Sequence, residues 1–538
     1  MSRTDGFRLP YLVRGDIDGF FGLIVDNLVQ FLVVSSLLTG IYGMPAEIVF
    51  GRIFPGAALS LLLGNAFYTW QARRLAVREH RDDVCALPYG INTPSMYAFV
   101  FFIIGPVWAA NRGQLGDEAA ARLAWHVCLA AGFLSGVLEF AGAAVGAWVR
   151  RVTPRAALLA TLSGIAISLI SMPFVIHMFS RPLLCFIPLA IILACYLGRL
   201  RLPLGIPGGL AAVVAGAALA WAGGIMDTVA VRASVDGIGL CLPRLMVVEI
   251  LTDMDFRVLV NALPIIVPMG LMNALGTLQN IESAEAAGDS YRVGSTMAVN
   301  GLGTITGALF GSCFPTTVYI GHPGWKALGA RSGYSLLNGL VVTLLCLSGA
   351  LGVLVSLVPP ESVYPILLYI GLVICSQAFS STEERHYPAV CVGLIPGIAA
   401  WGLMLVGFSL TVASGGGFDL SVIETFRQML NFDLQGLMNL AGGFLFSAMF
   451  LTAITVYFID HDFGRVVIWS MVAAAFAFFG LIHSGTIVAG QFTDHVAPGA
   501  AWRFSVAYLM IAAVAVVFMA QERWNKEKCN RKREGKNG

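Results

Sequence analysis

Long apolar runs separated by short polar segments fill most of this chain. A helix that crosses a membrane needs about 20 mostly apolar residues, and many of these runs reach or approach that length. Two blocks of seven runs are separated by a polar segment at 226–257, and a final pair follows. The pattern predicts spans near 17–42, 46–70, 84–110, 122–149, 154–178, 183–198, 205–225, 258–280, 292–312, 314–330, 334–357, 362–380, 386–411, 436–458, 464–484 and 502–520.

Two of the predicted spans are interrupted in the same way. Residues 86–94 read Ala-Leu-Pro-Tyr-Gly-Ile-Asn-Thr-Pro, and residues 314–324 read Phe-Pro-Thr-Thr-Val-Tyr-Ile-Gly-His-Pro-Gly. Backbone groups in hydrocarbon need internal partners, so irregular backbone is tolerated only inside protein or along a polar cavity. One such interruption in each half of a chain indicates the binding site of a transporter.

Arginine and lysine are distributed unevenly between the predicted loops. Most of the 33 Lys and Arg residues fall on one side if the N-terminus is cytoplasmic, including seven after Glu522. The positive-inside rule then predicts a protein of the cytoplasmic (inner) membrane with both termini in the cytoplasm. Seven spans per half invert the second half relative to the first, an architecture common in secondary transporters. The predicted parts are a cytoplasmic N-terminus (1–16), a first seven-span repeat (17–225), an extracytoplasmic loop (226–257), a second, inverted seven-span repeat (258–460), a C-terminal pair of spans (461–521) and a basic cytoplasmic tail (522–538).

The composition supports a membrane protein and excludes other classes. The chain is 57% hydrophobic and only 12% charged, whereas a soluble protein carries roughly 25% charged residues. Its net charge of +2 gives no reason to expect a nucleic-acid partner. The 10 cysteines lack a C-x-x-C pair, so neither a metal site nor a thiol-redox site is indicated, and no cofactor is expected.

Two carboxylates lie inside predicted spans, Asp26 in the first and Glu139 in the fourth. A charge at this depth is costly and by default marks a functional site. We therefore predict ion coupling at Asp26 and Glu139, with a structural hydrogen bond as the alternative. Glu282 and Glu285, three residues apart at a span end, indicate an inner gate or a solvated helix end.

Polar side chains at the interruptions and on the neighbouring eighth span are the predicted substrate-binding residues. Where a helix resumes after each break, its free N–H groups and positive potential would favour an anion or an acceptor-rich ligand. The alternative is that the side chains only satisfy the broken backbone. The predicted set is Asn92, Thr93, Asn273, Thr316, Thr317, Tyr319 and His322.

Four stretches resemble one known family. Residues 145–172, Asn273-Ala-Leu-Gly-Thr-Leu278, Asn300-Gly-Leu-Gly-Thr-Ile305 with Gly311, and Pro315-Thr-Thr-Val-Tyr319 with Gly329-Ala-Arg-Ser-Gly333 resemble the nucleobase-cation symporter-2 (xanthine/uracil/vitamin C permease) superfamily. The hypoxanthine/guanine permease branch is the most similar, and the chain resembles a divergent member. The likeness follows most of 17–460 in span order.

The resemblance implies the uracil-permease fold. That fold is an all-α polytopic membrane protein with a 7+7 inverted repeat, in which spans 1–4 and 8–11 form a core and spans 5–7 and 12–14 a gate. Short antiparallel strands in spans 3 and 10 meet at the substrate. The family usually has acidic residues in spans 8 and 10, where this chain has Gly270 and Gly321, and the last two spans lie beyond its fourteen.

We therefore predict a permease that moves a small polar solute by alternating access, with a purine or related nucleobase as the first candidate. H⁺ or Na⁺ are candidate coupling ions, membrane lipid surrounds the chain, and a homodimer is a candidate assembly. A small organic or inorganic anion, as in sulfate permeases of this fold, is the alternative substrate. A non-transporting receptor or scaffold is the alternative of another class. The chain lacks His-Glu-x-x-His, Gly-x-Ser-x-Gly and Walker A motifs, so no enzyme is expected.

Overall fold

The computed structural model describes residues 10–40, 42–203, 206–236, 238–248, 256–414, 418–488 and 491–537. Short π-helical segments join α2 to α3, α4 to α5 and α7 to α8. Helices up to the polar segment are α1 (Arg14–Gly40), α2 (Ala46–Ile48), α3 (Phe54–Glu79), α4 (Thr93–Phe99), α5 (Gly105–Leu115), α6 (Asp117–Val152), α7 (Arg155–Ile165), α8 (Met172–Ser180), α9 (Pro182–Ile192), α10 (Gly208–Ala222) and α11 (Thr228–Asp236). Later helices are α13 (Phe256–Ala286), α14 (Val293–Leu309), α15 (His322–Ala327), α16 (Gly333–Leu347), α17 (Leu351–Leu357), α18 (Tyr364–Ser380), α19 (Tyr387–Ala413), α20 (Ser421–Leu430), α21 (Leu434–Ala441), α22 (Phe444–Ile459), α23 (Phe463–Phe478) and α24 (Trp502–Asn537). The strands are β1 (Tyr89–Ile91), β2 (Thr316–Val318), β3 (Gly485–Val488) and β4 (Gln491–Asp494).

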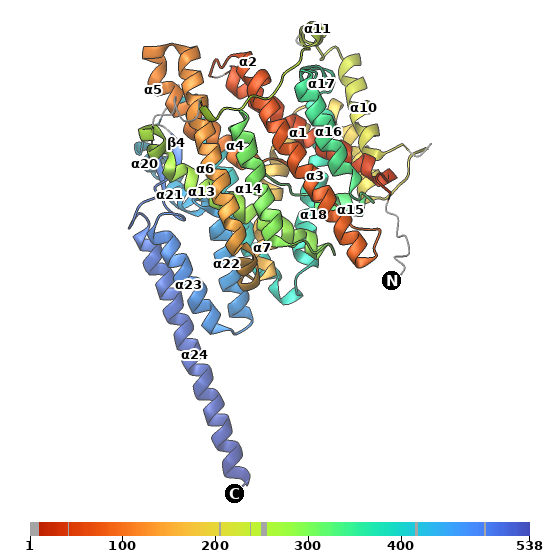
Figure 1. Ribbon diagram of the computed structural model, residues 1–538. Helices are drawn as coiled ribbons and strands as arrows, with labels where there is room; N and C mark the ends of the chain where they lie inside the picture. The colour runs from red at the N-terminus through yellow and green to blue at the C-terminus, as the bar shows by residue number, and fades with distance from the viewer. Residues whose placement is uncertain are drawn as a thin grey trace. The chain divides into compact units, whose positions relative to one another are not determined.

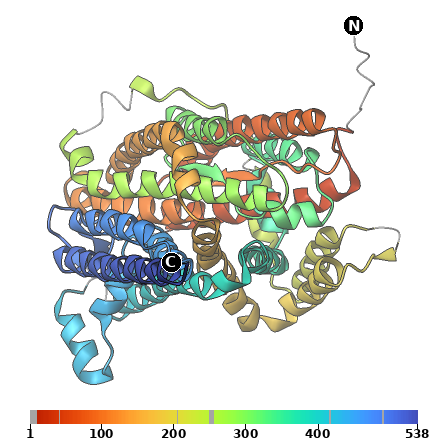
Figure 2. The same ribbon diagram turned by 90° about the horizontal axis from the view of Figure 1, so that it is seen from below.

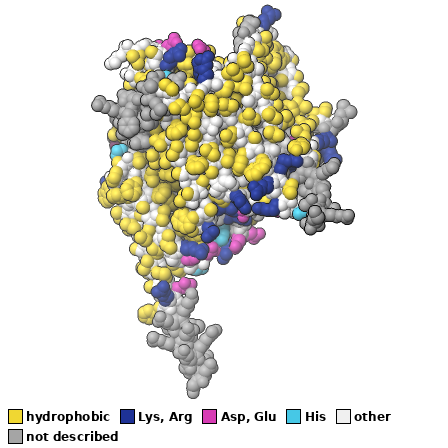
Figure 3. Space-filling model, viewed as in Figure 1, with side chains coloured by type: hydrophobic (Ala, Val, Ile, Leu, Met, Phe, Trp, Pro, Cys, Tyr) yellow, Lys and Arg dark blue, Asp and Glu magenta, His cyan; other side chains and the backbone are white. Residues whose placement is uncertain are grey.

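The helices account for the apolar runs of the sequence. Seven helical stretches of the described chain are long and apolar enough to cross a membrane, and α21 with α22 makes an eighth if the bent pair is one span. Shorter apolar helices include α10, α16 and α23. Figure 3 shows hydrophobic side chains over much of the face in view, as expected of a surface in contact with lipid. The protein is a mostly helical, multi-pass membrane protein, as predicted.

The predicted span 436–458 is not one continuous helix. It is divided into α21 and α22, which meet at an angle of 84°. Gly443 lies at the bend with φ of +58°, a conformation that costs glycine little, and its N–H donates to Asp494 Oδ2 at 3.2 Å. The bend lies within the span predicted near 436–458, and there a side chain distant in sequence takes the N–H group that a continuous helix would use.

The chain forms two compact units. One comprises Met1–Arg151 and Ile170–Ile374, and the other comprises Val152–Leu169 and Cys375–Gly538. Each unit combines segments from both predicted repeats. Helices α9 and α10, which the resemblance assigns to the gate, fall in the unit that contains α1.

Hydrogen bonds explain why α10 belongs with α1. Asp18 of α1 accepts the backbone N–H of Gly209 at 3.1 Å and the hydroxyl of Tyr196 at 3.3 Å. Within the same unit α1, α3 and α16 pack against one another (Figure 1). The pairing of helices follows these contacts and not their order in the chain.

In the other unit, α23 and α24 lie side by side along the length of α23 (Figure 2). Asp462 begins α23, because its Oδ1 accepts the N–H of Arg465 at 3.1 Å, an N-cap. The link between the two helices contains the antiparallel pair β3–β4, which the sequence did not predict. This hairpin brings Asp494 to the bend between α21 and α22.

The two interrupted spans meet as an antiparallel strand pair. In the β1–β2 register Tyr89 lies opposite Val318, Gly90 opposite Thr317 and Ile91 opposite Thr316. The strand pair expected from the resemblance is therefore confirmed. Both strands are buried in the first unit, so the site can be described without reference to the second.

Candidate functional site

The strand pair has only two strands, yet side chains take most of its outward backbone groups. Thr304 Oγ1 accepts the N–H of Thr316 at 3.1 Å, and its single proton is shared between the Thr316 carbonyl at 3.1 Å and Glu139 Oε2 at 3.0 Å. Asn300 Oδ1 accepts the N–H of Val318 at 2.9 Å, and Asn280 Nδ2 donates to the Val318 carbonyl at 2.8 Å. On β1 the carbonyl of Ile91 accepts the Tyr319 hydroxyl. Side chains replace the missing neighbouring strands, which is how irregular backbone can persist at membrane depth.

One face of the strand pair packs tightly against α3 and α14. The Tyr89 hydroxyl lies 2.7 Å from Thr316 Oγ1, which lies 2.8 Å from Ser60 Oγ. Gly64 of α3 and Gly303 of α14 touch the Tyr89 ring and hydroxyl so closely that a Cβ at either glycine would overlap them. Both Tyr89 and Thr316 are fully buried. The predicted substrate residue Thr316 therefore holds the strands against α3 and α14.

The other face carries Gly90 and Thr317. Thr317 Oγ1 lies 3.1 Å from Thr277 Oγ1 of α13. A Cβ on Gly90 would overlap Asn27 Oδ1 of α1 and the Tyr319 ring, so these groups lie directly over bare backbone. Among the described residues, buried Asn27 Oδ1 has no hydrogen-bond partner. We call this surface, made by Asn27, Gly90, Thr277, Thr317 and Tyr319, the strand-pair face.

Glu139 is the centre of a buried hydrogen-bond network behind β2. Its Oε1 accepts Asn273 Nδ2 at 2.9 Å and Ser135 Oγ at 3.3 Å. Its Oε2 accepts Asn300 Nδ2 and Thr304 Oγ1, each at 3.0 Å. The side chain is 1% exposed and forms no ion pair with any described residue. An acid whose four hydrogen-bond partners are neutral can gain or lose a proton without breaking a salt bridge.

The remaining predicted residues fall in different places. Asn273 joins Glu139 to Ser95 of α4 through its Oδ1, at 2.6 Å. Asn92 Oδ1 accepts the N–H of Ser95 at 3.0 Å and caps α4. Thr93 is the half-buried first residue of that helix. Asp26 is half-buried in α1 and shares a side-chain hydrogen bond with Gln30.

His322 belongs to a separate ionic cluster. Its Nε2 lies 3.1 Å from Asp289 Oδ2 and 3.0 Å from the Cys85 carbonyl. Asp289 also accepts Lys326 Nζ at 2.6 Å and Arg81 at 3.0 Å. Burial alone would raise the pKa of Asp289, but its hydrogen bonds with His322, Lys326 and the Cys85 N–H hold that pKa below its usual value. The structure thus separates His322 from the strand-pair face.

Two further predictions concern the end of α13. Glu282 Oε2 accepts Arg150 Nε at 2.6 Å, and Glu285 pairs with the same guanidinium. The two acids do share a helix face, as their spacing indicates, and both bind one arginine of α6. No cluster of three or more metal-ligating side chains occurs in the part of the chain that the structure describes.

The sequence analysis did not single out several residues of the network. All of them contact β2. The side chains of Asn280, Asn300 and Thr304 bond its backbone, and Thr277 bonds the Thr317 side chain. Their spacing carried a usable signal: Thr277 and Asn280 are three apart on α13, Asn300 and Thr304 four apart on α14. Polar pairs at these spacings on apolar helices form a single polar stripe.

Comparison with known proteins adds a distant likeness. No family model matches the chain, and no curated protein matches it. Among solved structures, it is similar to the transmembrane domain of a cyanobacterium bicarbonate transporter, BicA. The TM-score is 0.44 and the identity 14%, over 71% of this chain and 94% of that chain. A likeness of this size assigns neither family nor substrate, so the functional argument rests on the residues of the site.

Proposed function

We propose that this protein is a secondary transporter that binds a small polar solute on the strand-pair face. The observation that carries the proposal is the meeting of the two interrupted spans as β1 and β2 inside one buried polar network. Broken segments of this kind, one from each half of a chain, form the substrate sites of transporters. Alternating access would expose the face to the two sides of the membrane in turn.

A neutral heterocycle such as a nucleobase is the first candidate substrate. The strand-pair face and its surroundings offer both acceptors and donors. Asn27 Oδ1 has no partner among the described residues, and neither has the Nδ2 of Asn338 on α16, whose Oδ1 accepts Asn27 Nδ2 at 3.4 Å. The Thr277 and Thr317 hydroxyls can donate or accept. The Tyr319 ring can stack on a planar ligand. Neither Asp26 nor Glu139 forms an ion pair within the described chain, so the nearby charge is acidic. That balance favours a neutral ligand over an anion.

Glu139 is the proposed proton-coupling residue. Asn300 uses its oxygen on Val318, so its Nδ2 must be the group that faces Glu139 Oε2. A proton on Glu139 would therefore be directed to a hydroxyl, either Ser135 or Thr304, since an amide nitrogen cannot accept it. Asp26, the second proposed ion-coupling group, lies in α1 next to Asn27 of the strand-pair face.

A small anion is the second candidate, because α4 and α15 begin within a few residues of the strand ends, at Thr93 and His322. Helix N-termini supply N–H donors and positive potential to anions. Against this, Asn92 already takes the N–H of Ser95, and Pro94 and Pro323 have no N–H to offer. Few donors remain at these two helix starts.

The test combines binding with transport. Purified protein would be screened for thermal stabilisation by purines, pyrimidines, urate, sulfate, bicarbonate and carboxylates, since a ligand of the folded state raises the melting temperature. Hits would then be assayed for uptake into proteoliposomes with and without a proton gradient. Thr317→Val tests the strand-pair face, and Thr306→Val, a half-buried threonine bonded to its own helix, is the matched control.

We expect one heterocycle to stabilise and enter the vesicles, with both effects lost in Thr317→Val only. Stabilisation by anions alone would replace the nucleobase by the anion candidate. Binding without uptake would instead support a receptor. If no compound bound through Thr317, the strand-pair face would be refuted as the site. Labelling of single cysteines placed near each terminus, in intact and in permeabilised cells, would test the proposed inner-membrane orientation with both termini in the cytoplasm.

A further inference from the structure

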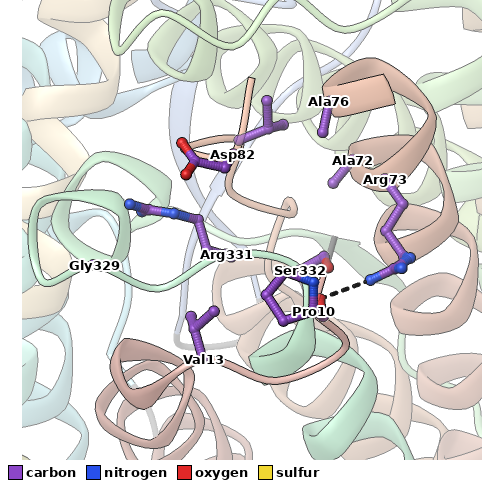
Figure 4. A pocket seen from close by; sticks show the side chains of 10 residues that line it. Pro10, Val13, Ala72, Arg73, Ala76, Asp82, Gly329, Arg331 and Ser332 are labelled. Carbon is purple, nitrogen blue, oxygen red and sulfur yellow. Dashed lines mark hydrogen bonds between the residues drawn. The ribbon is translucent and has the colours of Figure 1, made fainter. Parts of the chain in front are cut away.

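A cavity lined by two arginines lies at the end of α3, and none of its lining residues belongs to the strand-pair face. It encloses about 200 Å³, several times the roughly 30 Å³ that a water takes up in the liquid. The 10–13 segment, the end of α3, the 82–84 loop and the 329–332 loop line it (Figure 4). Arg73 and Arg331 are its basic residues, and the arginine distribution predicts that this end of the unit faces the cytoplasm.

The backbone of Arg331 joins three parts of the fold. Its N–H donates to Asp16 Oδ1 of α1 at 2.7 Å, and its carbonyl accepts the N–H of Ala86 at 2.9 Å. Ala86 leads into β1, and Arg331 follows β2 and α15. A ligand held by Arg331 would therefore touch the chain on the inner side of both interrupted spans.

The Arg331 guanidinium retains hydrogen-bonding capacity at the cavity wall. It donates to the Ala330 carbonyl at 3.0 Å and forms no ion pair with a described acid. A guanidinium has five N–H donors in a planar fork, so most of them remain available. A half-buried guanidinium with available donors beside a cavity suits planar or tetrahedral oxyanions.

Arg73 lies on the opposite side of the cavity in Figure 4. Its Nη1 donates to the Pro10 carbonyl at 3.0 Å, and its guanidinium carbon lies 4.1 Å from the centre of the Tyr11 ring. These contacts fix the side chain at the rim, where its charge adds to the positive potential of the cavity. Asp82 is the cavity's one acid among the lining residues, and it is exposed, so the lining has a net positive charge.

We propose that this cavity binds a phosphate group, with Arg331 as its main ligand and Arg73 as the second. The proposal is independent of the transport function, because it uses none of the residues of the strand-pair face. A phosphate here joins the 10–13 segment to the loops that flank β1 and β2, and so stabilises the first unit. The phosphate can belong to an anionic lipid headgroup at the membrane surface or to a soluble ion.

The experiment measures thermal unfolding of the full-length protein at constant ionic strength. One arm adds inorganic phosphate in detergent, with chloride as the reference. The other compares nanodiscs of phosphatidylglycerol with nanodiscs of phosphatidylcholine. The variants are Arg331→Gln, Arg331→Lys and Arg73→Gln. The control is Arg74→Gln, an exposed arginine that lies over Trp70 and does not line the cavity.

We expect phosphate to raise the melting temperature of the wild type by about 2–4 °C. Arg331→Gln should weaken the response at least about tenfold in phosphate concentration, as loss of a charge-assisted bond implies. Arg331→Lys should restore part of it, and Arg74→Gln should respond as the wild type does. A response in phosphatidylglycerol nanodiscs alone would assign the phosphate to lipid. An equal response in wild type and Arg331→Gln, or none in either arm, would overturn the proposal even if the protein transports normally.

Discussion

Asn300 connects Glu139 directly to strand β2. Its Nδ2 donates to Glu139 Oε2 at 3.0 Å, and its Oδ1 accepts the N–H of Val318 at 2.9 Å. The amide cannot turn over without breaking the second bond, because only its oxygen can accept an N–H. The amide therefore links the carboxylate to the backbone of β2, and we expect a change of protonation at Glu139 to reach the strand through it.

The first prediction concerns Glu139→Gln. The substitution keeps the size of the side chain but places an amide nitrogen among four donors, so at least one buried donor loses its acceptor. We expect a proton gradient to stop driving solute accumulation, while solute exchange across the vesicle membrane continues. In proteoliposomes, uptake measures gradient-driven accumulation and counterflow measures solute exchange. Glu118→Gln, which alters an exposed acid paired with Arg122, is the control; gradient-driven uptake in Glu139→Gln would exclude the coupling role.

The second prediction compares two threonines of α14. Thr304→Val removes the hydroxyl that bonds Glu139 and both backbone groups of Thr316, which leaves a buried N–H unpaired. We expect a loss of about 1–3 kcal/mol in unfolding free energy. Thr306→Val, which loses only a bond to Leu302 of its own helix, should change stability much less. Chemical unfolding in detergent measures both, and equal losses would show that Thr304 does not support β2.

The third prediction concerns close packing at Gly90. Gly90→Ala forces a methyl group into Asn27 and the Tyr319 ring, so we expect a destabilisation of about 1–3 kcal/mol from overpacking. Solute binding should be lost as well, because the methyl group occupies the strand-pair face. Gly113→Ala, in α5 with open space around it, is the control and should be neutral or slightly stabilising. Thermal shift with and without solute separates the two effects, and normal binding by Gly90→Ala would contradict the assignment.

The fourth prediction concerns acid stability at Asp289. Its pKa is held below the ordinary value, so its stabilising contribution is present above about pH 4 and is lost as the pH falls through the depressed pKa. Asp289→Asn should cost roughly 3 kcal/mol at pH 7, since Lys326 and Arg81 lose their buried partner and keep only more exposed acids. The difference from wild type should shrink on acidification. Melting temperatures from pH 7 to pH 3 test this, with exposed Asp117→Asn as the control; a difference that grows towards low pH would refute it.

The fifth prediction concerns Asp494, for which stability changes with pH in the opposite direction. Burial raises the pKa of Asp494 to about 6, although the Gly443 N–H works against this. The folded state therefore loses stability as the pH rises from about 4 to 6, at about 1.4 kcal/mol per pKa unit. Asp494→Asn should melt higher than wild type at pH 7.5 and nearly equally at pH 4. Asp419, whose hydrogen bonds from Ser421 lower its pKa, is the control, and Asp419→Asn should give no gain at pH 7.5. A destabilised Asp494→Asn at pH 7.5 would show that the carboxylate is needed in its charged form.

The sequence predicted the two interruptions and the buried carboxylate because these features break strong local rules. Proline and polar residues inside an apolar run, or an acid such as Glu139, can be recognised from one segment alone. The helical spans followed from hydropathy in the same way. The strand pairing itself came from resemblance to a family, and β1–β2 confirms it.

Other features depend on contacts between distant segments and leave no local mark. The bend at Gly443 requires Asp494, about 50 residues further along the chain. His322 stands beside an interruption in the sequence, but Asp289 and the Cys85 carbonyl hold it in another cluster. Thr316 and Thr317 are neighbours with the same side chain, yet strand alternation directs one towards α3 and α14 and the other towards Thr277 of α13. Only the register of β1 against β2 decides which of the two threonines lies on which face.

The side chains that complete the edges of β1 and β2 have a mechanical consequence. Asn280 comes from α13, and Asn300 and Thr304 come from α14, so the strands are fastened to both helices through their backbones. The strand-pair face cannot slide or tilt by itself without releasing several buried hydrogen bonds together. In the proposed transport cycle we therefore expect α13 and α14 to move together with the strands, and the solute to stay on the same residues throughout.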